Sequence, residues 1–360
     1  MNRIERLQQQ LTGEGLDAFL VRETPNIAYL TGFEGVFDDE RAHALLVQDG
    51  RAILHTDSRY ANACKQAAET GGSLVQIDDE AVPYAEWLAK CITQGTLGIE
   101  DSISLAEFHK LEEAMAESVQ LRETKAVVSK LRQVKDAAEL GHMRAAQAIT
   151  DAAFSHIVTV MKPGMTEREV AHELDNFMFA QGADALAFPT IVATGPNAAN
   201  PHAQPGETAL EAGQCVVMDF GARVAGYCSD MTRTVFLGEP NEKLARAYAA
   251  LREANETVEA MLKPGITGAA AHQKALDVLE EAGFGGTMGH GLGHSLGLEI
   301  HEDPVLSPRY QEALQAGNVL TVEPGIYIPG EFGMRLEDFG VLTESGFEVF
   351  TQSTHDLVLV

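Results

Sequence analysis

Four carboxylates occupy matching places in two strand-like hairpins. In the first, CVVMDFGARV and YCSDMTRTVFL meet near Val224–Gly226, and an antiparallel register centred there sets Asp219 opposite Asp230. In the second, NVLTVEPGIYI and GMRLEDFGVL flank a Pro-Gly-Glu turn, and the same argument sets Glu323 opposite Glu337. Carboxylates that face each other in apolar strands repel, so each pair needs a cation, a shared proton or solvent.

A glycine-rich segment, GHGLGHSLGLEIHE at 289–302, holds His290, His294 and His301. Its four glycines disfavour a stable helix, so it is not the helical HExxH zinc motif. Carboxylates together with imidazole form a set of oxygen and nitrogen ligands that suits two divalent ions such as Mn²⁺, Co²⁺ or Zn²⁺. Two such ions lower the pKa of a water between them, so the set indicates a metal-dependent hydrolase.

An internal repeat places these segments symmetrically. MKPGMT at 161–166 recurs as LKPGIT at 262–267, and each copy stands between an Ala-rich helical stretch and a second helix that ends in glycine. In each copy Pro-Gly ends one helix and Thr can cap the next. We therefore expect two duplicated half-domains that share one core, with a pseudo-twofold axis that brings all four carboxylates to one point.

The first part of the chain differs from the rest. Short apolar runs there alternate with amphipathic stretches, a pattern typical of an α/β domain. From residue 125 a long Ala-rich helical stretch follows, which we expect to bridge two domains. The sequence therefore predicts one domain over 1–124 and a catalytic domain over 125–360.

The composition argues against several classes of partner. The chain has 26 Lys and Arg against 53 Asp and Glu, so its net charge of −27 repels nucleic acid and anionic membrane surfaces. No apolar run approaches the roughly 20 residues of a membrane-spanning helix, and the first residues do not resemble a signal peptide. The four cysteines form no CxxC pair, which disfavours a disulfide framework or a thiolate zinc site. A cytoplasmic protein is expected.

Five motifs, in their order and spacing, carry a resemblance to a known family: VVMDFG, CSDMTRT, HGLGHSLGLEIHE, TVEPGIY and GMRLEDFG. Together they resemble the Xaa-Pro branch of the pita-bread metallopeptidases, which includes aminopeptidase P and prolidase. The likeness covers essentially the whole chain. It implies an α+β fold, in which a pita-bread (creatinase/aminopeptidase) catalytic domain with pseudo-twofold halves follows a smaller α/β creatinase-like domain. It also implies a homodimer.

The resemblance further implies the metal ligands. They would be Asp219, Asp230, His294, Glu323 and Glu337. Asp230 and Glu337 would bridge two ions. Asp219 would bind one ion, and His294 and Glu323 would bind the other. Mn²⁺ is the ion expected first, with Co²⁺ or Zn²⁺ as alternatives.

By the same resemblance, further residues would act on the substrate. His202, in NPHAQP, or His301 would stabilise the developing oxyanion, and His290 and Arg335 would line the substrate site. Glu323 would carry a proton from the attacking water to the leaving nitrogen. Two simpler readings stay open. His202 could be an ordinary loop histidine, and Arg335 could only orient the acid two residues after it.

The activity expected is hydrolysis of the bond between an N-terminal residue and a following proline in small peptides, that is, an Xaa-Pro aminopeptidase. The alternative is a prolidase restricted to dipeptides, which must recognise a free C-terminal carboxylate. A non-enzymatic metal-binding module and a creatinase-type enzyme are disfavoured by the intact set of acids. A methionine aminopeptidase is disfavoured because that group usually lacks the N-terminal domain.

Overall fold

The computed structural model describes residues 2–33, 35–38, 40–71 and 73–360. Its contacts divide the chain into two compact units, Met1–Arg132 and Gln133–Val360. Helix α6 (Val127–Arg132) lies beyond the boundary predicted at residue 124, and it packs in the first unit against α1 and α2. None of the helices in the described part of the chain combines the length and apolar character needed to cross a bilayer.

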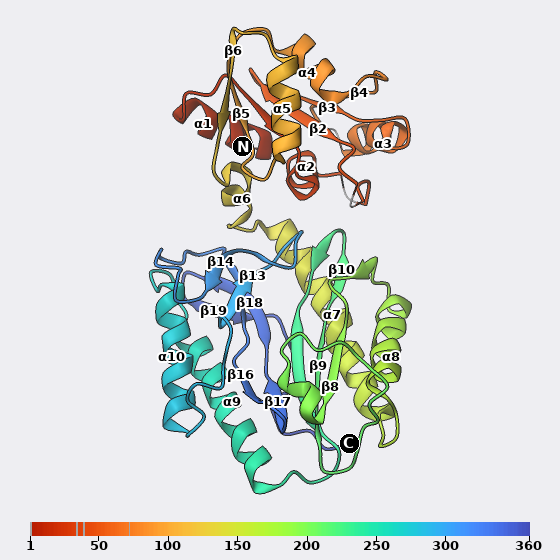
Figure 1. Cartoon of the computed structure of the whole chain (residues 1–360), viewed down its shortest axis with the longest axis vertical. Helices are drawn as coiled ribbons and strands as arrows, with labels where there is room; N and C mark the ends of the chain where they lie inside the picture. Colours follow the sequence, from red (N-terminus) through yellow and green to blue (C-terminus); the bar gives the residue numbers. More distant parts are fainter. Residues whose placement is uncertain (1, 34, 39, 72) are drawn as a thin grey trace. The chain divides into compact units, whose positions relative to one another are not determined.

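The first unit is built on one six-stranded sheet in the order β4-β3-β2-β1-β5-β6, coloured red to orange in Figure 1. Its central strand β1 is wholly buried, and it pairs antiparallel with β2 and parallel with β5. The strands are β1 (Ala18–Val21), β2 (Ala44–Gln48), β3 (Arg51–His55), β4 (Val75–Asp78), β5 (Gly95–Ile99) and β6 (Val119–Glu123). The other helices are α1 (Arg3–Gly13), α2 (Thr24–Thr31), α3 (Ala61–Gly71), α4 (Tyr84–Cys91) and α5 (Leu105–Ala114).

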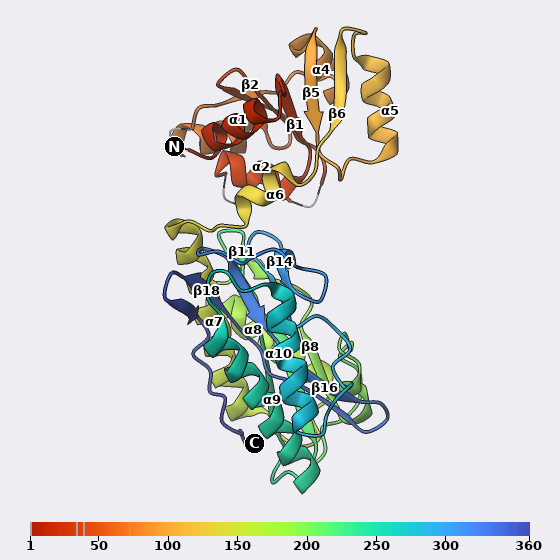
Figure 2. The ribbon, with the colours of Figure 1, turned by 90° about the vertical axis from the view of Figure 1, so that its left-hand side faces the viewer.

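Figure 1 shows the strands of the second unit between two pairs of long helices, and Figure 2 shows the same unit turned by 90°. The helices are α7 (Ala137–Val160), α8 (Glu167–Ala180), α9 (Glu242–Met261) and α10 (Gly268–Glu281), with a short 3-10 turn at Gly195–Ala199. The strands are β7 (Ala185–Leu186), β8 (Ile191–Thr194), β9 (Cys215–Phe220), β10 (Ala222–Val224), β11 (Tyr227–Cys228), β12 (Met231–Phe236), β13 (Gly293–Ser295), β14 (Glu302–Leu306), β15 (Val319–Val322), β16 (Gly325–Ile328), β17 (Phe332–Arg335), β18 (Asp338–Thr343) and β19 (Gly346–Val349). Two main hydrophobic clusters form its core, one under α9 and α10 and one under α7 and α8.

Equivalent contacts recur in the two halves of this unit. The side chain of Thr166 caps α8 and that of Thr267 caps α10. The backbone of Thr166 pairs with Ala209, and the backbone of Thr267 pairs with Ala313. The repeated Pro-Gly segments therefore sit in equivalent places, in agreement with the half-domains expected from the repeat.

The predicted register of the first hairpin is wrong by two residues. Asp219 on β9 lies opposite Thr232 on β12, and Asp230 immediately precedes β12. The chain reverses at Ala225 and Gly226, which both have positive φ, at 50° and 84°. That is the pattern of a two-residue type I′ turn, and it places the centre of the hairpin one residue later than the sequence suggested.

The second hairpin has the predicted register. Val322 on β15 lies opposite Asp338 on β18, and Gly325 on β16 lies opposite Arg335 on β17. Glu323 and Glu337 lie between these two ladders. The pairing on either side of them places the two acids opposite each other. The second unit thus brings two acids from each half toward its centre.

Candidate metal centre

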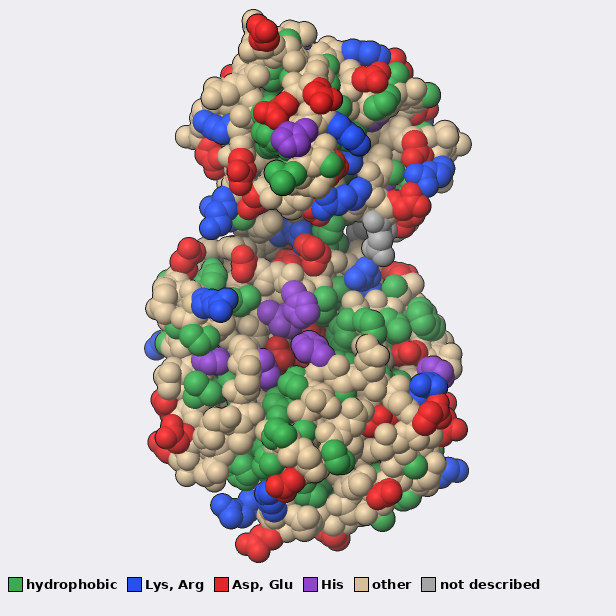
Figure 3. All heavy atoms as spheres, viewed as in Figure 1, with side chains coloured by type: hydrophobic (Ala, Val, Ile, Leu, Met, Phe, Trp, Pro, Cys, Tyr) green, Lys and Arg blue, Asp and Glu red, His purple; other side chains and the backbone are tan. Residues whose placement is uncertain are grey.

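A cavity of about 750 Å³ opens in the second unit. Every residue that the sequence singled out for chemistry lines it: His202, Asp219, Asp230, His290, His294, His301, Glu323, Arg335 and Glu337. Figure 3 shows histidine side chains gathered on one face of this unit, with acidic side chains between them. Residues that are as much as 135 positions apart in the sequence therefore meet in one place.

The tightest group in the cavity consists of Asp230, His294 and Glu337. One potential ligand atom from each lies within 4.8 Å of the others. The Nε2 atom of His294 is 3.6 Å from Asp230 Oδ2 and 3.5 Å from Glu323 Oε1. Asp219 lines the same cavity. All five expected ligands therefore face one space.

Hydrogen bonds hold His294 in one ring orientation. Its backbone N donates to Thr321 Oγ1 at 3.0 Å, and its Nδ1 lies 3.0 Å from the carbonyl oxygen of Ser295. A carbonyl oxygen only accepts, so Nδ1 carries the hydrogen and Nε2 presents a lone pair to the carboxylates. Burial lowers the pKa of His294 to about 4, so the ring is neutral at pH 7. A neutral nitrogen that faces acids is suited to binding a metal.

The four acids are poorly accommodated without a cation. Burial raises the pKa of Glu323 to about 8. Burial also raises the pKa of Asp230 and of Glu337 well above the usual range, and repulsion from neighbouring carboxylates adds to it. Asp219 Oδ1 is buried and has no hydrogen-bond partner among the described residues. Because a bound cation would relieve the repulsion and supply that missing partner, these residues fit divalent metal.

Groups from one half of the unit support the acids of the other. Arg335 donates a hydrogen bond to Asp219, and its Nε donates to Thr232 Oγ1 at 2.9 Å. Thr232 in turn donates to Glu337 Oε2 at 2.6 Å. The simpler reading of Arg335, as a salt-bridge partner of Glu337, is therefore not what the contacts show. Arg335 pairs with Asp219 and is linked to Glu337 through the hydroxyl of Thr232.

Tyr327 is a site residue that the sequence analysis missed. Its Oη accepts from Arg335 Nη1 at 2.8 Å and lies 3.2 Å from His290 Nε2. Since His290 Nδ1 donates to the carbonyl of Gly291 at 2.7 Å, Nε2 is an acceptor and the tyrosine hydroxyl donates to it. The available signal was the position of Tyr327 in the TVEPGIY motif, four residues after Glu323.

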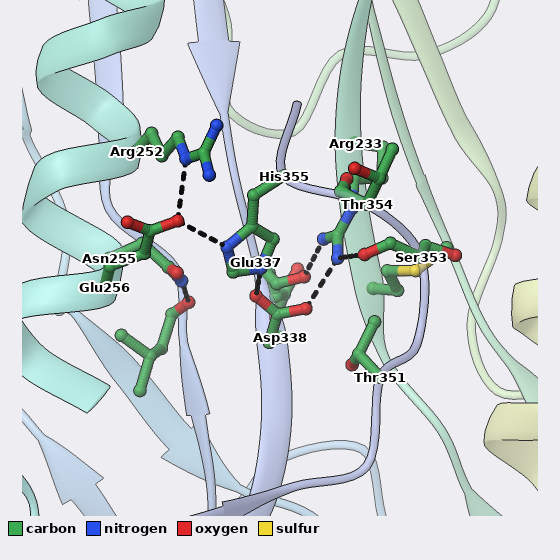
Figure 4. A network of polar contacts seen from close by, with 12 residues as sticks. Arg233, Arg252, Asn255, Glu256, Glu337, Asp338, Thr351, Ser353, Thr354 and His355 are labelled. Carbon is green, nitrogen blue, oxygen red and sulfur yellow. Dashed lines mark hydrogen bonds and ion pairs between the residues drawn. The ribbon is translucent and has the colours of Figure 1, made fainter. Parts of the chain in front are cut away.

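A buried polar network lies behind the carboxylates (Figure 4). Arg233 Nη1 donates to the carbonyl oxygen of Glu337 at 2.6 Å, and its Nη2 donates to Asp338 Oδ1 at 2.6 Å. The ring of His355 lies 2.6 Å from the other oxygen of Asp338. Burial would raise the pKa of Asp338, but Arg233 and His355 hold it below the usual value. The network holds the backbone of Glu337 in place.

Two histidines lie at the exposed edge of the cavity. The ring of His301 packs edge-on against that of His294, with 4.5 Å between the centroids. His202 lies on a loop that Glu167 holds, because its carboxylate accepts from Gly206 N at 3.0 Å and from Asn197 Nδ2 at 2.9 Å. Histidines from both halves of the unit thus face the cavity. Part of its wall is apolar, formed by Phe188, Pro189, Ile300 and Val305.

Comparison with known proteins adds two family matches. Residues 141–344 match the model of metallopeptidase family M24, and residues 3–134 match that of the creatinase/prolidase N-terminal domain. An uncharacterized peptidase of Bacillus subtilis is 36% identical over 364 residues, which cover 99% of this chain and all of the relative.

Two solved structures are similar over nearly the whole chain. An Xaa-Pro dipeptidase from Bacillus anthracis is 37% identical, with a TM-score of 0.92 and coverage of 99% of each chain. An X-Pro aminopeptidase from Thermotoga maritima is 33% identical, with a TM-score of 0.88 and coverage of 99% of this chain and 100% of the other. Both the fold and the order of its two domains are therefore shared with these enzymes.

Proposed function

The chain belongs to metallopeptidase family M24, with a creatinase/prolidase N-terminal domain before a pita-bread catalytic domain, and we propose that it hydrolyses the peptide bond between an N-terminal residue and a following proline. The observation that carries this proposal is the convergence in one cavity of Asp219, Asp230, His294, Glu323 and Glu337. The similar structures from Bacillus anthracis and Thermotoga maritima, which are both Xaa-Pro peptidases, support the choice of substrate.

We propose that these five residues hold two divalent ions, with Mn²⁺ as the first candidate. Asp230 and Glu337 would be shared between the ions, and the closeness of their ligand atoms, which lie within 4.8 Å of each other, supports this. Asp219 would serve one ion, and His294 with Glu323 the other. Ions bound there would polarise the substrate carbonyl as Lewis acids and lower the pKa of a bound water.

Glu323 is proposed to move the proton. When water adds to the carbonyl carbon, a C–O bond forms, and the C–N bond to proline then breaks. The proline nitrogen leaves as an amine only if it receives a proton. Glu323 lines the cavity beside His294, so its carboxylate can accept the proton that the attacking water releases and pass it to the nitrogen.

The histidines at the edge of the cavity are proposed to act on the carbonyl oxygen. His301 and His202 are exposed and face the cavity, so either can donate to the oxygen as negative charge develops there. His290 and Arg335 line the same cavity, where their contacts with Tyr327 hold them in place. The apolar wall offers a surface for the pyrrolidine ring of proline.

We propose that peptides longer than two residues are accepted. Arg335 is the one Lys or Arg side chain among the described residues that line the cavity. Its donors are engaged by Asp219, Thr232 and Tyr327, so a dipeptide carboxylate would have to displace them. Restriction to dipeptides is the second candidate, and the Xaa-Pro dipeptidase from Bacillus anthracis, at 37% identity, favours it.

Product analysis by mass spectrometry tests the proposal. Purified protein is incubated with Mn²⁺ and either Ala-Pro or Ala-Pro-Ala, with EDTA as a control and Ala-Ala-Ala as a peptide without proline. Cleavage of Ala-Pro-Ala to Ala and Pro-Ala supports the aminopeptidase, whereas cleavage of Ala-Pro alone assigns a prolidase. If neither proline peptide is cleaved in an EDTA-sensitive way, the proposed activity is wrong.

The homodimer and the cytoplasmic location are also kept as proposals. Light scattering during gel filtration tests the first, since a dimer has twice the chain mass of 38.8 kDa. Cell fractionation tests the second. A monomeric mass or a secreted protein would contradict them.

A further inference from the structure

His294 lies on β13, and His301 is the last residue of the loop that joins β13 to β14. Ser295 and Glu302 are the last pair of this ladder, opposite each other across the base of the loop. The pairing register shifts between His294 and Ser295, an irregularity that bends a strand and redirects its side chains. The positions of residues 296–301 therefore depend on how the base is held.

A buried lysine from another part of the chain joins the two sides of this base. Lys135 Nζ donates to Ser295 Oγ at 2.9 Å and to Glu302 Oε2 at 3.2 Å. The side chain of Lys135 is only 1% exposed and that of Glu302 only 6%. The other oxygen of Glu302 accepts from the backbone N of Glu299, inside the loop, at 3.1 Å. One ammonium group thus binds both strands, and one carboxylate binds the loop.

The surroundings keep both partners in place. The backbone N of Lys135 donates to the carbonyl of Gly317 at 2.9 Å, just before β15. The absence of a side chain at Gly297 leaves room for Glu302, because a Cβ there would lie 2.8 Å from Glu302 Oε1. The backbone of Gly297 also accepts from Cys228 N at 2.8 Å, so the loop is tied to the first hairpin.

We propose that Lys135 is a positioning residue. By holding Ser295 and Glu302 together, it fixes the loop that ends at His301 and so positions the ring of that histidine at the cavity. Lys135 is not among the described residues that line the cavity, so it acts through this loop and does not touch the substrate. The inference rests on the proposed function, in which His301 faces the peptide.

Hydrogen exchange on the full chain, followed by mass spectrometry, tests the structural half of the proposal. In Lys135→Met we expect peptides that cover residues 293–303 to exchange at least about tenfold faster, because the base of the loop opens locally. Lys135→Arg keeps the charge and should restore most of the protection. Lys243→Met is the matched control, since it removes a lysine that pairs with Glu331 in the same unit, with a half-exposed side chain. It should leave 293–303 unchanged.

Unchanged exchange of 293–303 in Lys135→Met overturns the proposal. If that variant does not fold, Glu302→Gln takes its place, because it removes the carboxylate charge and keeps the shape of the side chain. The same local increase is then expected, and its absence has the same meaning. This measurement needs no substrate, so it decides the role of Lys135 even if the wild-type protein cleaves neither proline peptide and the proposed function fails.

A double-mutant cycle tests the catalytic half. Alone, Lys135→Met should lower kcat/KM by about 10²-fold, the scale expected when a reacting group is displaced by about 1 Å. In a His301→Ala background, the same change should cost less than about threefold, since the group that it positions is already gone. Equal losses in both backgrounds would show a general effect on stability and contradict positioning.

Discussion

The two halves of the second unit share a plan but differ in what they add to it. Each half has a threonine-capped helix after a Pro-Gly pair, a backbone pairing of that threonine with an alanine, and a hairpin with two acids. The first half adds the loop with His202, which Glu167 holds. The second half adds the glycine-rich loop with three histidines. The duplicated parts therefore supply the carboxylates, and the unique parts supply most of the imidazoles.

Neither half supports its own acids alone. Asp219 of the first half accepts from Arg335 of the second, and Glu337 of the second half accepts from Thr232 of the first. The backbone of Glu337 is held by Arg233, also from the first half. Both halves therefore build the site, so removing an acid from either half should lower activity to a similar extent.

The largest effect is expected from the two central acids, one from each half. Asp230→Ala and Glu337→Ala should each lower kcat/KM by more than about 10³-fold and reduce the bound metal, because the metal supplies several kcal/mol to the reaction. Activity assays with elemental analysis check this. Glu331→Ala, an acid on the turn of the second hairpin whose side chain is 52% exposed, is the control. Near-wild-type turnover in either ligand variant would refute a jointly built centre.

Because Arg335 of the second half pairs with Asp219 of the first, removing its charge should destabilise the protein. Arg335→Met leaves the buried Asp219 without its cation, which should lower the free energy of unfolding of the metal-free protein by about 3–5 kcal/mol. Thermal melting with and without Mn²⁺ measures it. A smaller loss with Mn²⁺ present is expected, since bound metal compensates for the missing charge. The same loss in both conditions would place Asp219 outside the metal centre.

The unique parts of the halves should affect turnover but not metal content. His301→Ala is expected to lower kcat by about 10²–10³-fold, the usual effect of losing one donor to an oxyanion. His202→Ala tests the corresponding histidine of the first half. Bound metal is measured in parallel. If His301→Ala loses metal instead, His301 is a ligand and the choice of His294 is wrong.

The smallest expected effect concerns the network behind Glu337. Burial would lower the pKa of His355, but hydrogen bonds with Asp338 and Glu256 raise it above the usual 6.5. A raised pKa in the folded state stabilises the protein fully below pH 6.5, and the gain is lost as the pH rises through the folded pKa. His355→Gln should therefore cost about 1.5–3 kcal/mol at pH 6 and less at pH 9. Urea unfolding at both pH values checks this, and a cost independent of pH would contradict a charged His355.

The sequence was most informative where residue type and spacing carry the chemistry. All the predicted ligands line one cavity, because the repeat gives each half a hairpin with two acids and the two halves meet there. The register of the second hairpin was predictable from its Pro-Gly turn. The first was not, because one of its two positive-φ residues is Ala225, which carries no turn signal.

The supporting contacts could not be predicted from the sequence alone. Thr232 and Glu337 are 105 residues apart, and so are Arg233 and Asp338. Such contacts depend on how the two halves pack against each other. Threonine and arginine are also too common in sequences for their type alone to predict these contacts. Tyr327 was missed for the same reason, since its partners become visible only when Arg335 and His290 are in place.

We propose that acids from both halves hold two ions in one cluster. Anomalous diffraction from crystals soaked in Mn²⁺, collected at the manganese edge, tests it most directly. Two peaks are expected in the cavity, with Asp230 and Glu337 in contact with both and His294 in contact with one. A single peak, or peaks bound by the acids of only one half, would contradict it.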